Sequence, residues 1–477
     1  MKLKELLKNV DQEIAEIDVK AIALDTKDVK EGSLFFCLKG SKCDGHDYAK
    51  LAEEKGAVCI VAEHCIDQLC IPCVVVEDTR IALSMASSAF YSHPERQLKI
   101  VGITGTNGKT TTAYIVRSIL RSSGKKVGMI GTNGVFIDDN IIPSRGMTTP
   151  DPTELFYLLR LMANDGVDVV VMEVSAHALE LKKVAEIRFT VGAFTNFSQD
   201  HLDYFETMEK YALAKLKLFL QSKYVVTNMD DMLGRKISED QRERAFTYGL
   251  INPADVFAVN EEYGFDGIRF IMNVCDDLIE ISSSLSGKFN VYNIMCASLI
   301  CRILGASSEA ISEGVRATRR VNGRFNVINT AKYSIIIDFA HTEDGLKNAL
   351  EAIREFNASR IITVFGCGGD RDKTKRKNMG RVVSTLSDYC IITSDNPRSE
   401  EPEQIICDIE RGVESKNYAT VVDRKQAIRM ATEMAEENDI IFIAGKGAER
   451  YQEINGVKYE YNDEDYVCSL IERNVIK

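Results

Sequence analysis

The chain has 477 residues, of which 45% are hydrophobic, and it carries a formal net charge of −12. This length exceeds what a single hydrophobic core organises and predicts roughly two to four domains. The acidic balance excludes a general nucleic-acid or membrane-surface binder, because such proteins need a broad basic field.

The amino-terminal segment and the apolar runs indicate where the protein is located. The segment MKLKELLKNVDQEIAEIDVK is amphipathic and rich in acids, so it lacks the apolar core of a secretion signal. No apolar run in the sequence reaches the roughly 18 residues needed to cross a bilayer. We therefore expect a cytoplasmic protein with no membrane insertion.

Residues 1–97 contain short strand-like runs, SLFFCL, AVCIVAE and IPCVVVED, separated by helical stretches. Cys70 and Cys73 have C-x-x-C spacing, but a structural zinc site needs a second such pair, which the sequence lacks. The 13 cysteines are scattered, and an odd number without a secretion signal is typical of reduced thiols. We interpret the pair as buried, unligated cysteines rather than as a metal or redox site.

Residues 98–325 have a rhythm of strand, loop and helix. KIVGITG leads into a helix from Lys109, and KKVGMIG, VDVVVMEVS and FTVGAFTN are nearly all apolar. Continuous apolar runs suit parallel strands that are buried on both faces. We therefore predict a central domain with a parallel sheet of the P-loop ATPase kind.

Residues 326–477 alternate the apolar runs YSIIIDFA, RIITVFGCGG, YCIITSDN and DIIFIAGKG with helical segments. This pattern predicts a Rossmann-like parallel sheet with helices on both faces. The expected fold class is therefore α/β with three domains, at 1–97, 98–325 and 326–477. Ligands of open α/β sheets bind at the carboxyl ends of strands, so chemistry should collect where these runs end.

The stretch VGITGTNGKTTT joins the first central strand to its helix. It departs from the pattern G-x-x-x-x-G-K-[ST] because Ile103 stands where the first glycine is required. In this setting successive backbone N–H groups and the helix amino terminus point at an anion. We predict that Lys109 reaches the β- and γ-phosphates of a nucleotide and that Thr110 or Thr111 binds Mg²⁺. A glycine-rich turn without a ligand is the alternative.

Two polar segments follow later strands of the central domain. Glu173 ends an apolar run, where a buried carboxylate is costly unless it meets a cation. Asp200, His201 and Asp203 follow another run, in FTNFSQDHLDYF. Mg²⁺ prefers oxygen ligands, and a histidine beside nucleotide phosphates is acceptable in a mixed site. Each segment alone is more typical of a structural role, but with the loop they predict a metal–nucleotide site.

GTNGKTTT, EVSAHAL, TNFSQDHLDY and EKYALAKLKLF together resemble the Mur ligases, ATP-dependent amide-forming enzymes of peptidoglycan precursor synthesis. The resemblance extends over essentially the whole chain and implies that Lys215 is a carbamylated lysine, with a solvated helix lysine as the alternative. Captured CO₂ would turn an ammonium that repels Mg²⁺ into a carboxylate-like ligand. The implied ATP-binding residues are Gly105, Thr106, Asn107, Gly108, Lys109, Thr110, Thr111, Asn293, Arg324, Asp338 and His341. The implied Mg²⁺ ligands are Thr110, Thr111, Glu173, His201 and Lys215, and the implied catalytic residues are Lys109, Glu173, His201 and Lys215.

The segment LDTKDVKEGSLFFCLKGSKCDGHDY resembles the amino-terminal signature of the family members that add the third residue of the peptide. This implies a UDP-sugar-binding domain at residues 1–97, with substrate contacts from Thr26, Lys27, Gly45, His46 and Asp47. The residues implied near the muramoyl or peptide part are Thr148, Thr149, Ser175 and Lys183. Lys27 and Lys183 stand where the family usually has arginine, so the charge is kept but not the arginine fork.

GCGGDRDKTKR, DNPRSEEP and GKGAERYQ resemble the amino-acid site of the members that add diaminopimelate. The implied contacts are Arg376, Asp395, Asn396, Pro397, Arg398, Gly445 and Glu449. An arginine fork suits the distal carboxylate of diaminopimelate and Glu449 suits its distal ammonium, whereas lysine lacks that carboxylate. A surface ion pair of Arg398 with Glu400 or Glu401 is the alternative. Ala448 departs from the family, which commonly has histidine there.

The resemblance implies ATP-dependent addition of meso-diaminopimelate to UDP-N-acetylmuramoyl-L-Ala-D-Glu through an acyl phosphate. ATP and Mg²⁺ are required, no nucleic acid takes part, the protein is expected to be a monomer, and residues 321–325 are the candidate hinge for domain closure. The same reaction with L-lysine or another diamine is one alternative. A nucleotide-binding regulatory or scaffold paralogue with little ligase activity is another. Folylpolyglutamate synthetase shares the loop but does not need the amino-terminal domain.

Overall fold

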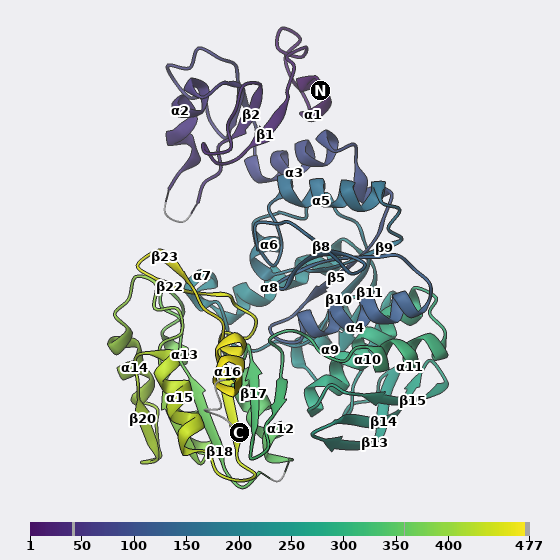
Figure 1. Cartoon of the computed structure of the whole chain (residues 1–477). Coiled ribbons are helices and arrows are strands. Elements are labelled where there is room, and N and C mark those ends of the chain that lie inside the picture. Colours follow the sequence, from purple (N-terminus) through teal and green to yellow (C-terminus); the bar gives the residue numbers. More distant parts are fainter. Residues whose placement is uncertain (41–42, 357, 473–477) are drawn as a thin grey trace. The chain divides into compact units, whose positions relative to one another are not determined.

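The computed structural model of the chain describes residues 1–40, 43–356 and 358–472 (Figure 1). Its contacts divide it into two compact units. Unit 1 consists of residues 1–104, 125–192 and 214–224, and unit 2 consists of residues 105–124, 193–213 and 225–477. Each unit is described separately below.

The amino-terminal part of unit 1 is a parallel sheet in the order β1-β2-β3-β4. The strands are β1 (Ala21–Ala23), β2 (Ser33–Phe36), β3 (Ala57–Ala62) and β4 (Cys73–Val75). Side chains alternate between two cores along β2. Phe36 packs with α3 (Thr79–Phe90) and α1 (Leu3–Leu6), whereas Phe35 packs with α2 (Ala49–Glu54). The three strand-like runs predicted for this region are therefore confirmed.

The thiols of this region differ from the prediction. Cys70 is exposed and Cys73 is partly buried, so the expected burial of the pair is wrong. Cys70 lies in a connection before β4, where its backbone N–H donates to Glu53, and only Cys73 enters the strand. All 13 cysteines of the chain are free thiols, in agreement with the expectation of reduced cysteines.

The remainder of unit 1 contains parallel strands β5 (Lys99–Thr104), β9 (Val169–Glu173) and β6 (Val127–Gly131), paired in the order β5-β9-β6. β7 (Gly134–Ile137) and β8 (Asn140–Ile142) extend them as an antiparallel edge. The residues of β6 and β9 are buried throughout, as expected for strands covered on both faces. The helices of this part are α5 (Pro152–Asn164) and α6 (Ala176–Glu180). Residues of both units occur in β10 (Phe189–Phe194), α8 (Met208–Leu220) and β11 (Ser222–Asn228).

Unit 2 begins with α4 (Lys109–Ser122), against which α10 (Lys288–Ile303) and α11 (Ser308–Ala317) pack. The packing of α4 on α11 is close, since a Cβ at Gly314 would lie 2.3 Å from the Cα of Ile119. β12 (Ala245–Tyr248) leads into a meander of β13 (Val256–Gly264), β14 (Gly267–Val274) and β15 (Asp277–Ser283). The two short helices of this part are α7 (Leu202–Phe205) and α9 (Met232–Asp240).

The carboxy-terminal sheet has the strand order β16-β17-β21-β18-β19-β20. These strands are β16 (Asn326–Asn329), β17 (Ser334–Asp338), β18 (Ile361–Phe365), β19 (Tyr389–Ile392), β20 (Tyr418–Thr420) and β21 (Ile440–Ala444). Only β16 is antiparallel among the described strands of this sheet. The four apolar runs predicted here form β17, β18, β19 and β21.

Helices cover both faces of this sheet, as Figure 1 shows. On one face lie α12 (Glu343–Arg354), α13 (Thr374–Leu386) and α14 (Pro402–Glu410), and on the other lie α15 (Arg424–Met434) and α16 (Asp463–Glu472). The Rossmann-like prediction is therefore confirmed. A hairpin of β22 (Tyr451–Ile454) and β23 (Val457–Glu460) follows the last parallel strand.

The segment proposed as a hinge has backbone angles that few residues adopt. Gly323 has φ +67° and Phe325 has φ +49°. A Cβ at Gly323 would lie 2.0 Å from the backbone nitrogen of Ala448, so this turn is packed against the loop after β21. The hinge role and the domain boundaries near residues 97 and 325 remain predictions.

Candidate active site

The phosphate loop, residues 105–109, connects β5 to α4 and depends on two glycines in the left-handed half of backbone space. Gly105 has φ +146° and Gly108 has φ +84°. A Cβ at Gly105 would lie 1.9 Å from Thr195 Oγ1, and one at Gly108 would lie 2.4 Å from Asn293 Oδ1. Larger side chains would therefore push the loop away from the segment after β10 and from α10.

The segment after β10 supports the phosphate loop by hydrogen bonds. The Thr106 N–H donates to the Asn196 carbonyl at 2.9 Å, and the Asn107 N–H donates to Asn196 Oδ1 at 2.8 Å. Thr195 Oγ1 donates to the Asn107 carbonyl at 2.6 Å. These contacts fix the loop before any ligand binds.

Lys109 begins α4 and folds back over the phosphate loop. Its Nζ donates to the carbonyls of Gly105 at 2.9 Å and Thr106 at 2.8 Å. The ammonium is thus held at the amino terminus of a 14-residue helix, where backbone N–H groups and the helix dipole favour an anion. This arrangement suits a phosphate group.

A cavity of about 500 Å³ opens beside the phosphate loop. Its size is in the range of small-molecule and cofactor sites. Six of the residues predicted to bind ATP line it: Asn107, Gly108, Thr111, Asn293, Arg324 and Asp338. Gly105, Thr106, Lys109, Thr110 and His341 are not among its lining residues. Sequence reasoning missed other lining groups, such as Asp230 and Asn348, because no motif marks them.

Arg324 and Asp338 order the wall of this cavity. Arg324 Nη2 donates to Thr110 Oγ1 at 3.1 Å, and the guanidinium lies 4.4 Å from the centre of the Phe339 ring. Asp338 accepts the N–H groups of Phe325 at 2.7 Å and Ala340 at 2.8 Å. Burial raises the pKa of the Asp338 carboxyl against the opposing charge of Arg324. Asp338 therefore supports the backbone that presents Arg324.

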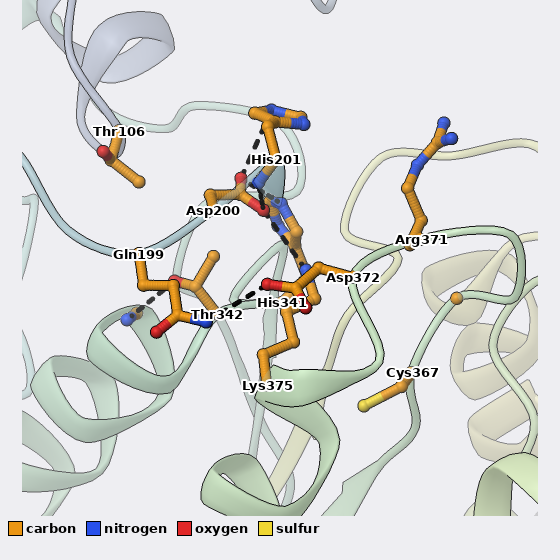
Figure 2. Close-up of polar contacts among 12 residues, drawn as sticks. Thr106, Gln199, Asp200, His201, His341, Thr342, Cys367, Arg371, Asp372 and Lys375 are labelled. Atoms are coloured by element: carbon orange, nitrogen blue, oxygen red, sulfur yellow. Dashed lines mark hydrogen bonds and ion pairs between the residues drawn. The ribbon is translucent and has the colours of Figure 1, made fainter. Parts of the chain in front are cut away.

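Asp200 is a buried carboxylate to which three side chains converge (Figure 2). Its oxygens lie 3.3 Å from His201 Nε2, 3.5 Å from His341 Nε2 and 3.3 Å from Lys375 Nζ. Burial alone would raise its pKa. A hydrogen bond from His341 and the charges of Lys375 and the histidines instead hold the pKa of the Asp200 carboxyl well below its usual range. The structure thus brings together two predicted residues, His201 and His341, through a carboxylate that lies between them.

Further hydrogen bonds join the same segments of unit 2. Gln199 Nε2 donates to Asp372 at 3.1 Å and to Thr374 at 3.0 Å, and Asn107 Nδ2 donates to Asp344 at 3.1 Å. The loop before α7, the start of α12 and the start of α13 therefore meet beside the phosphate loop. Asp203, by contrast, is exposed.

Glu173 and Lys215, two predicted metal ligands, lie in unit 1, whereas Thr110, Thr111 and His201 lie in unit 2. Glu173 is 2% exposed and accepts hydrogen bonds from Thr132 N at 2.9 Å and Thr132 Oγ1 at 3.1 Å. Lys215 is 1% exposed, so the alternative of a solvated helix lysine is wrong. Within the described ranges, no group of three His, Cys, Asp or Glu side chains forms a metal site. The predicted Mg²⁺ ligands are not such a group, because they include threonine hydroxyls and a modified lysine.

Four predicted substrate residues of unit 1 lie next to Glu173 or on neighbouring segments. Thr149 Oγ1 donates to the Glu173 carbonyl at 3.0 Å and to Ser175 Oγ at 3.4 Å. Thr148 Oγ1 lies 3.1 Å from Thr132 Oγ1, which in turn donates to Glu173. Lys183 forms an ion pair of 2.8 Å with Asp151. Two distant segments of sequence thus form one polar cluster.

The predicted UDP-contacting residues lie after β1 and after β2, at the same edge of the amino-terminal sheet. Lys27 and Asp47 are exposed, and Thr26 is partly buried. His46 is 9% exposed, and both ring nitrogens are engaged, one 2.5 Å from Asp44 and the other accepting from Glu63 N at 3.0 Å. His46 therefore orders its loop, and a Cβ at neighbouring Gly45 would lie 2.5 Å from Leu38 N.

Arg376 is buried, with 0% of the residue exposed. Its guanidinium donates to Glu400 at 2.9 and 3.0 Å and to Asp408 at 3.0 Å. The hydrogen bond from Arg376 lowers the pKa of Glu400 to about 2. This geometry does not support a direct substrate contact by Arg376 and gives it a role in fixing the loop of Glu400. Arg371, in the loop between β18 and α13 and labelled in Figure 2, is exposed.

Arg398 is held by the β22–β23 hairpin in a left-handed conformation, with φ +51°. Its N–H donates to the Glu453 carbonyl at 3.0 Å, and its carbonyl accepts from Asn455 N at 2.7 Å. The guanidinium donates to the Gly369 carbonyl at 2.7 Å and lies 3.5 Å from the Glu453 carboxylate. The ion pair is therefore with Glu453 and not with Glu400 or Glu401, as the alternative assumed.

The other predicted amino-acid contacts lie at the carboxyl ends of β19 and β21. Asn396 Nδ2 donates to Glu449 at 2.9 Å, so two of them are in direct contact. A Cβ at Gly445 would lie 2.7 Å from the Asp395 carboxylate, and one at Gly369 would lie 1.9 Å from the Pro397 carbonyl. The three sequence segments predicted to form the amino-acid site are therefore adjacent in the structure.

Comparison with known proteins identifies the architecture. Three family models match: "Mur ligase family, catalytic domain" over residues 18–95, "Mur ligase middle domain" over residues 103–301 and "Mur ligase, glutamate ligase domain" over residues 323–447. UDP-N-acetylmuramoyl-L-alanyl-D-glutamate--2,6-diaminopimelate ligase 1 of Clostridium acetobutylicum is 42% identical over 479 residues, which cover 99% of each chain. The chain belongs to the Mur ligase family. The family prediction and the three-domain α/β fold are thus confirmed.

Other Mur ligases and a related enzyme extend the comparison. The diaminopimelate ligase of Bacillus licheniformis is 41% identical, with 97% of each chain covered. A solved UDP-N-acetylmuramoyl-L-alanyl-D-glutamate--2,6-diaminopimelate ligase has a TM-score of 0.70 at 30% identity and covers 100% of this chain and 99% of its own. Folylpolyglutamate synthase of Mycobacterium tuberculosis has a TM-score of 0.65 at 18% identity over 76% of this chain, which indicates a shared fold only. The roles of individual site residues in this Mur ligase remain predictions.

Replacing Lys375 by methionine should lower both the stability of the protein and its turnover. The variant removes a cation from buried Asp200, and breaking a buried ion pair costs about 3–5 kcal/mol where the remaining charge stays buried. We expect kcat/KM for ATP to fall at least about tenfold, since the start of α13 is no longer held beside His201. Steady-state ADP release measures this effect.

The matched control is Lys373→Met, two residues before Lys375, which removes an ion pair between an exposed lysine and Glu400 while Arg376 still pairs with Glu400. Exposed pairs contribute little, so its kinetics should stay within about twofold of the parent. Equal kinetic constants for the two variants would contradict a role of the Asp200–Lys375 pair.

Proposed function

We propose that this Mur ligase joins meso-diaminopimelate to UDP-N-acetylmuramoyl-L-Ala-D-Glu with the hydrolysis of ATP to ADP and phosphate. The observation that carries the proposal is the similarity to relatives bearing that name, 42% and 41% identical over nearly the full length of both chains. The phosphate loop with Lys109 at the start of α4 supports the use of ATP.

The reaction has two steps. An oxygen of the D-Glu γ-carboxylate attacks the γ-phosphorus of ATP, the bond to the bridging oxygen breaks, and an acyl phosphate and ADP result. The deprotonated amine of diaminopimelate then attacks the acyl carbon, and the tetrahedral intermediate releases phosphate as the amide forms. The first step brings like charges together, so it needs positive groups at the γ-phosphate. Lys109 supplies one, because its ammonium already lies on the loop.

Mg²⁺ belongs to the same proposal, as does carbamylation of Lys215. Thr110, Thr111, Glu173, His201 and carbamylated Lys215 would hold the ion, which when bound would neutralise phosphate charge. The burial of Lys215 supports this, because an ammonium that is 1% exposed is costly to keep charged. Glu173 fits as an oxygen ligand that is already oriented by Thr132.

Recognition of the amino acid belongs to the loops after β18, β19 and β21. Diaminopimelate carries an ammonium and a carboxylate at its far end, which call for a carboxylate and a cation in the site. Glu449 is 25% exposed at its side chain and Arg398 is 19% exposed, so both reach the surface of this loop cluster. Lysine has no distal carboxylate, so it would offer the Arg398 guanidinium no substrate carboxylate at this end.

Exclusion of water is the remaining requirement, since water would hydrolyse the acyl phosphate. The hydrogen bonds of Gln199 to Asp372 and Thr374, together with the Asp200 ion pair to Lys375, hold the phosphate side and the amino-acid side of unit 2 together. We infer that these contacts help to enclose the reacting groups.

The location and the assembly state predicted from the sequence remain part of this proposal. Within residues 1–40, 43–356 and 358–472, no helix is both long enough and apolar enough to span a membrane. The expectations of a cytoplasmic monomer without nucleic-acid partners remain predictions.

An ADP-release assay with UDP-N-acetylmuramoyl-L-Ala-D-Glu and a panel of amino acids tests the function. We expect ADP release that depends on the nucleotide substrate and is fastest with meso-diaminopimelate, with a product of matching mass. Faster turnover with L-lysine or another diamine would replace the proposed amino acid. Absence of amide product with every amine would favour a nucleotide-binding paralogue with little ligase activity.

Lys215→Ala should abolish turnover if the lysine carries a carbamate. A short carboxylic acid added to the assay should restore part of the activity, because it can supply the missing carboxylate to the metal site. Lys217→Ala is the matched control, since Lys217 lies on the same helix in an exposed ion pair with Glu180. A fully active Lys215→Ala variant would refute the carbamate.

Arg398→Ala should raise the KM for diaminopimelate by at least about tenfold, since a charge-assisted hydrogen bond contributes about 1.5–3 kcal/mol. The KM for ATP should change little. Because its side chain also bonds the Gly369 carbonyl, Arg398→Lys serves as a control that retains a charge without the fork. An unchanged KM for diaminopimelate with continued rejection of lysine would remove Arg398 from the amino-acid pocket.

A further inference from the structure

Lys446 is a lysine that is buried at the carboxyl end of β21, with 0% of the residue exposed. It lies between Gly445, with φ +117°, and Gly447, with φ +51°. Its Nζ donates to Asn396 Oδ1 at 2.9 Å and to Glu449 Oε2 at 2.8 Å. Burial of this degree leaves no room for direct contact with a ligand, so the ammonium acts on its neighbours.

The partners of Lys446 bond to each other and close a triangle. Asn396 Nδ2 donates to the same Glu449 oxygen at 2.9 Å. Asn396 Oδ1 also accepts the N–H of Glu453 at 2.9 Å, which ties the triangle to the β22–β23 hairpin. Both ends of the Asn396 amide are therefore assigned, and the Glu449 carboxylate receives two donors at one oxygen.

A second buried cation, Arg424, contacts the end of the strand that precedes Lys446. Arg424 binds Asp463 through two contacts of 2.8 Å and donates to the Ala444 carbonyl at 2.9 Å, directly before the Lys446 loop. Burial by itself raises the pKa of Asp395, but the charges of Lys446 and Arg424 hold it below its usual range. The charges of the two cations thus favour the ionised form of Asp395.

The cluster comprises three carboxylates and two cations: Asp395, Glu449, Asp463, Arg424 and Lys446. When all five are ionised, one net negative charge remains. Asp463 is 0% exposed and Asp395 is 8% exposed, whereas the Glu449 side chain is 25% exposed. The unbalanced charge is therefore accessible at Glu449. One additional monovalent cation at that position would neutralise the cluster.

We propose that Lys446 is a positioning residue that presents the Glu449 carboxylate, with the Asn396 amide, to the distal ammonium group of diaminopimelate, the one that does not react. The inference rests on the proposed function, because it concerns the amino-acid site of that reaction. From its buried position Lys446 orients the Glu449 carboxylate by a hydrogen bond, and the substrate ammonium contacts the exposed side of that carboxylate. The selectivity for an amine thus depends on a buried residue of the same charge sign.

This role makes a prediction opposite to that of a simple charge effect. Removal of the Lys446 ammonium makes the cluster more negative, so charge alone predicts tighter binding of an ammonium. Loss of orientation predicts weaker binding, because Glu449 and Asn396 lose their common donor.

Lys446→Met tests the proposal with two readouts. Formation of the acyl phosphate, trapped with hydroxylamine without any amino acid, should remain within about twofold of the parent. The KM for diaminopimelate in the complete reaction should rise at least about tenfold, whereas the KM for ATP should be unchanged. Lys446→Arg should give an intermediate KM because the charge remains. An unchanged or lowered KM, or an equal loss in both readouts, would overturn the proposal.

A double-mutant cycle with Glu449→Gln tests whether Lys446 acts through Glu449. We expect the Lys446→Met change to add less than about twofold to the KM once Glu449 is replaced. If the effects of the two substitutions on the KM multiply, Lys446 does not act through Glu449. Lys458→Met is the matched control, since Lys458 is exposed on the hairpin and lies over the Tyr451 ring that Lys446 also approaches.

The design separates this proposal from the proposed function. Amide formation from diaminopimelate by the parent protein tests the function alone, before any variant is compared. If Lys446→Met does not fold, Lys446→Gln gives the same comparison with a polar side chain of similar length. An active parent with an unaltered KM in the variant would leave the function standing and remove the role of Lys446.

Discussion

A buried carboxylate, Asp200, determines how several segments of unit 2 meet. An anion with 5% exposure is stable only where cations and hydrogen-bond donors surround it, and Lys375 and two histidines fulfil that role. Lys375 lies in the first turn of α13 and His341 precedes α12, so the carboxylate joins both helices to the loop before α7. The positions of His201 and of the loop after β18 relative to the phosphate loop therefore depend on the same charge.

The carboxy-terminal sheet repeats this use of buried charge at the ends of its strands. Arg376 fixes the loop of Glu400, Arg424 fixes the start of α16 through Asp463, and Lys446 fixes Asn396 and Glu449. Loops lack the hydrogen-bond ladders of helices and sheets, so a rigid loop needs other partners. Here each buried cation supplies several donors to the loops that surround the amino-acid site. If this is the amino-acid site, as we propose, its specificity depends on residues that lie beneath its surface.

Sequence patterns predicted the fold further than they predicted the roles of side chains. The apolar runs identified β5, β6, β9 and the parallel strands of the last sheet, because continuous burial leaves a clear signature. The meander β13–β15 was missed, although GIRFIMNV alternates buried and less buried residues along β14. Arg376 was expected at the substrate, but whether an arginine faces a ligand or a neighbouring carboxylate depends on packing that one motif does not encode. The motifs also located His46 and Asp200 along the chain, but they did not reveal the residues that these side chains contact, which come from distant segments.

Two Gly-Lys pairs in this chain illustrate why the motif alone does not assign a role. Lys109 and Lys446 both follow a glycine with positive φ after a buried parallel strand. Lys109 is partly exposed and bonds backbone carbonyls, which it can exchange for phosphate oxygens without stranding a buried charge. Lys446 is fully buried between a carboxylate and an amide, so exchange for a ligand would remove the one donor that Glu449 and Asn396 share. The same residue pair is therefore proposed to act on a substrate in one loop and on the protein in the other, and the degree of burial separates the two.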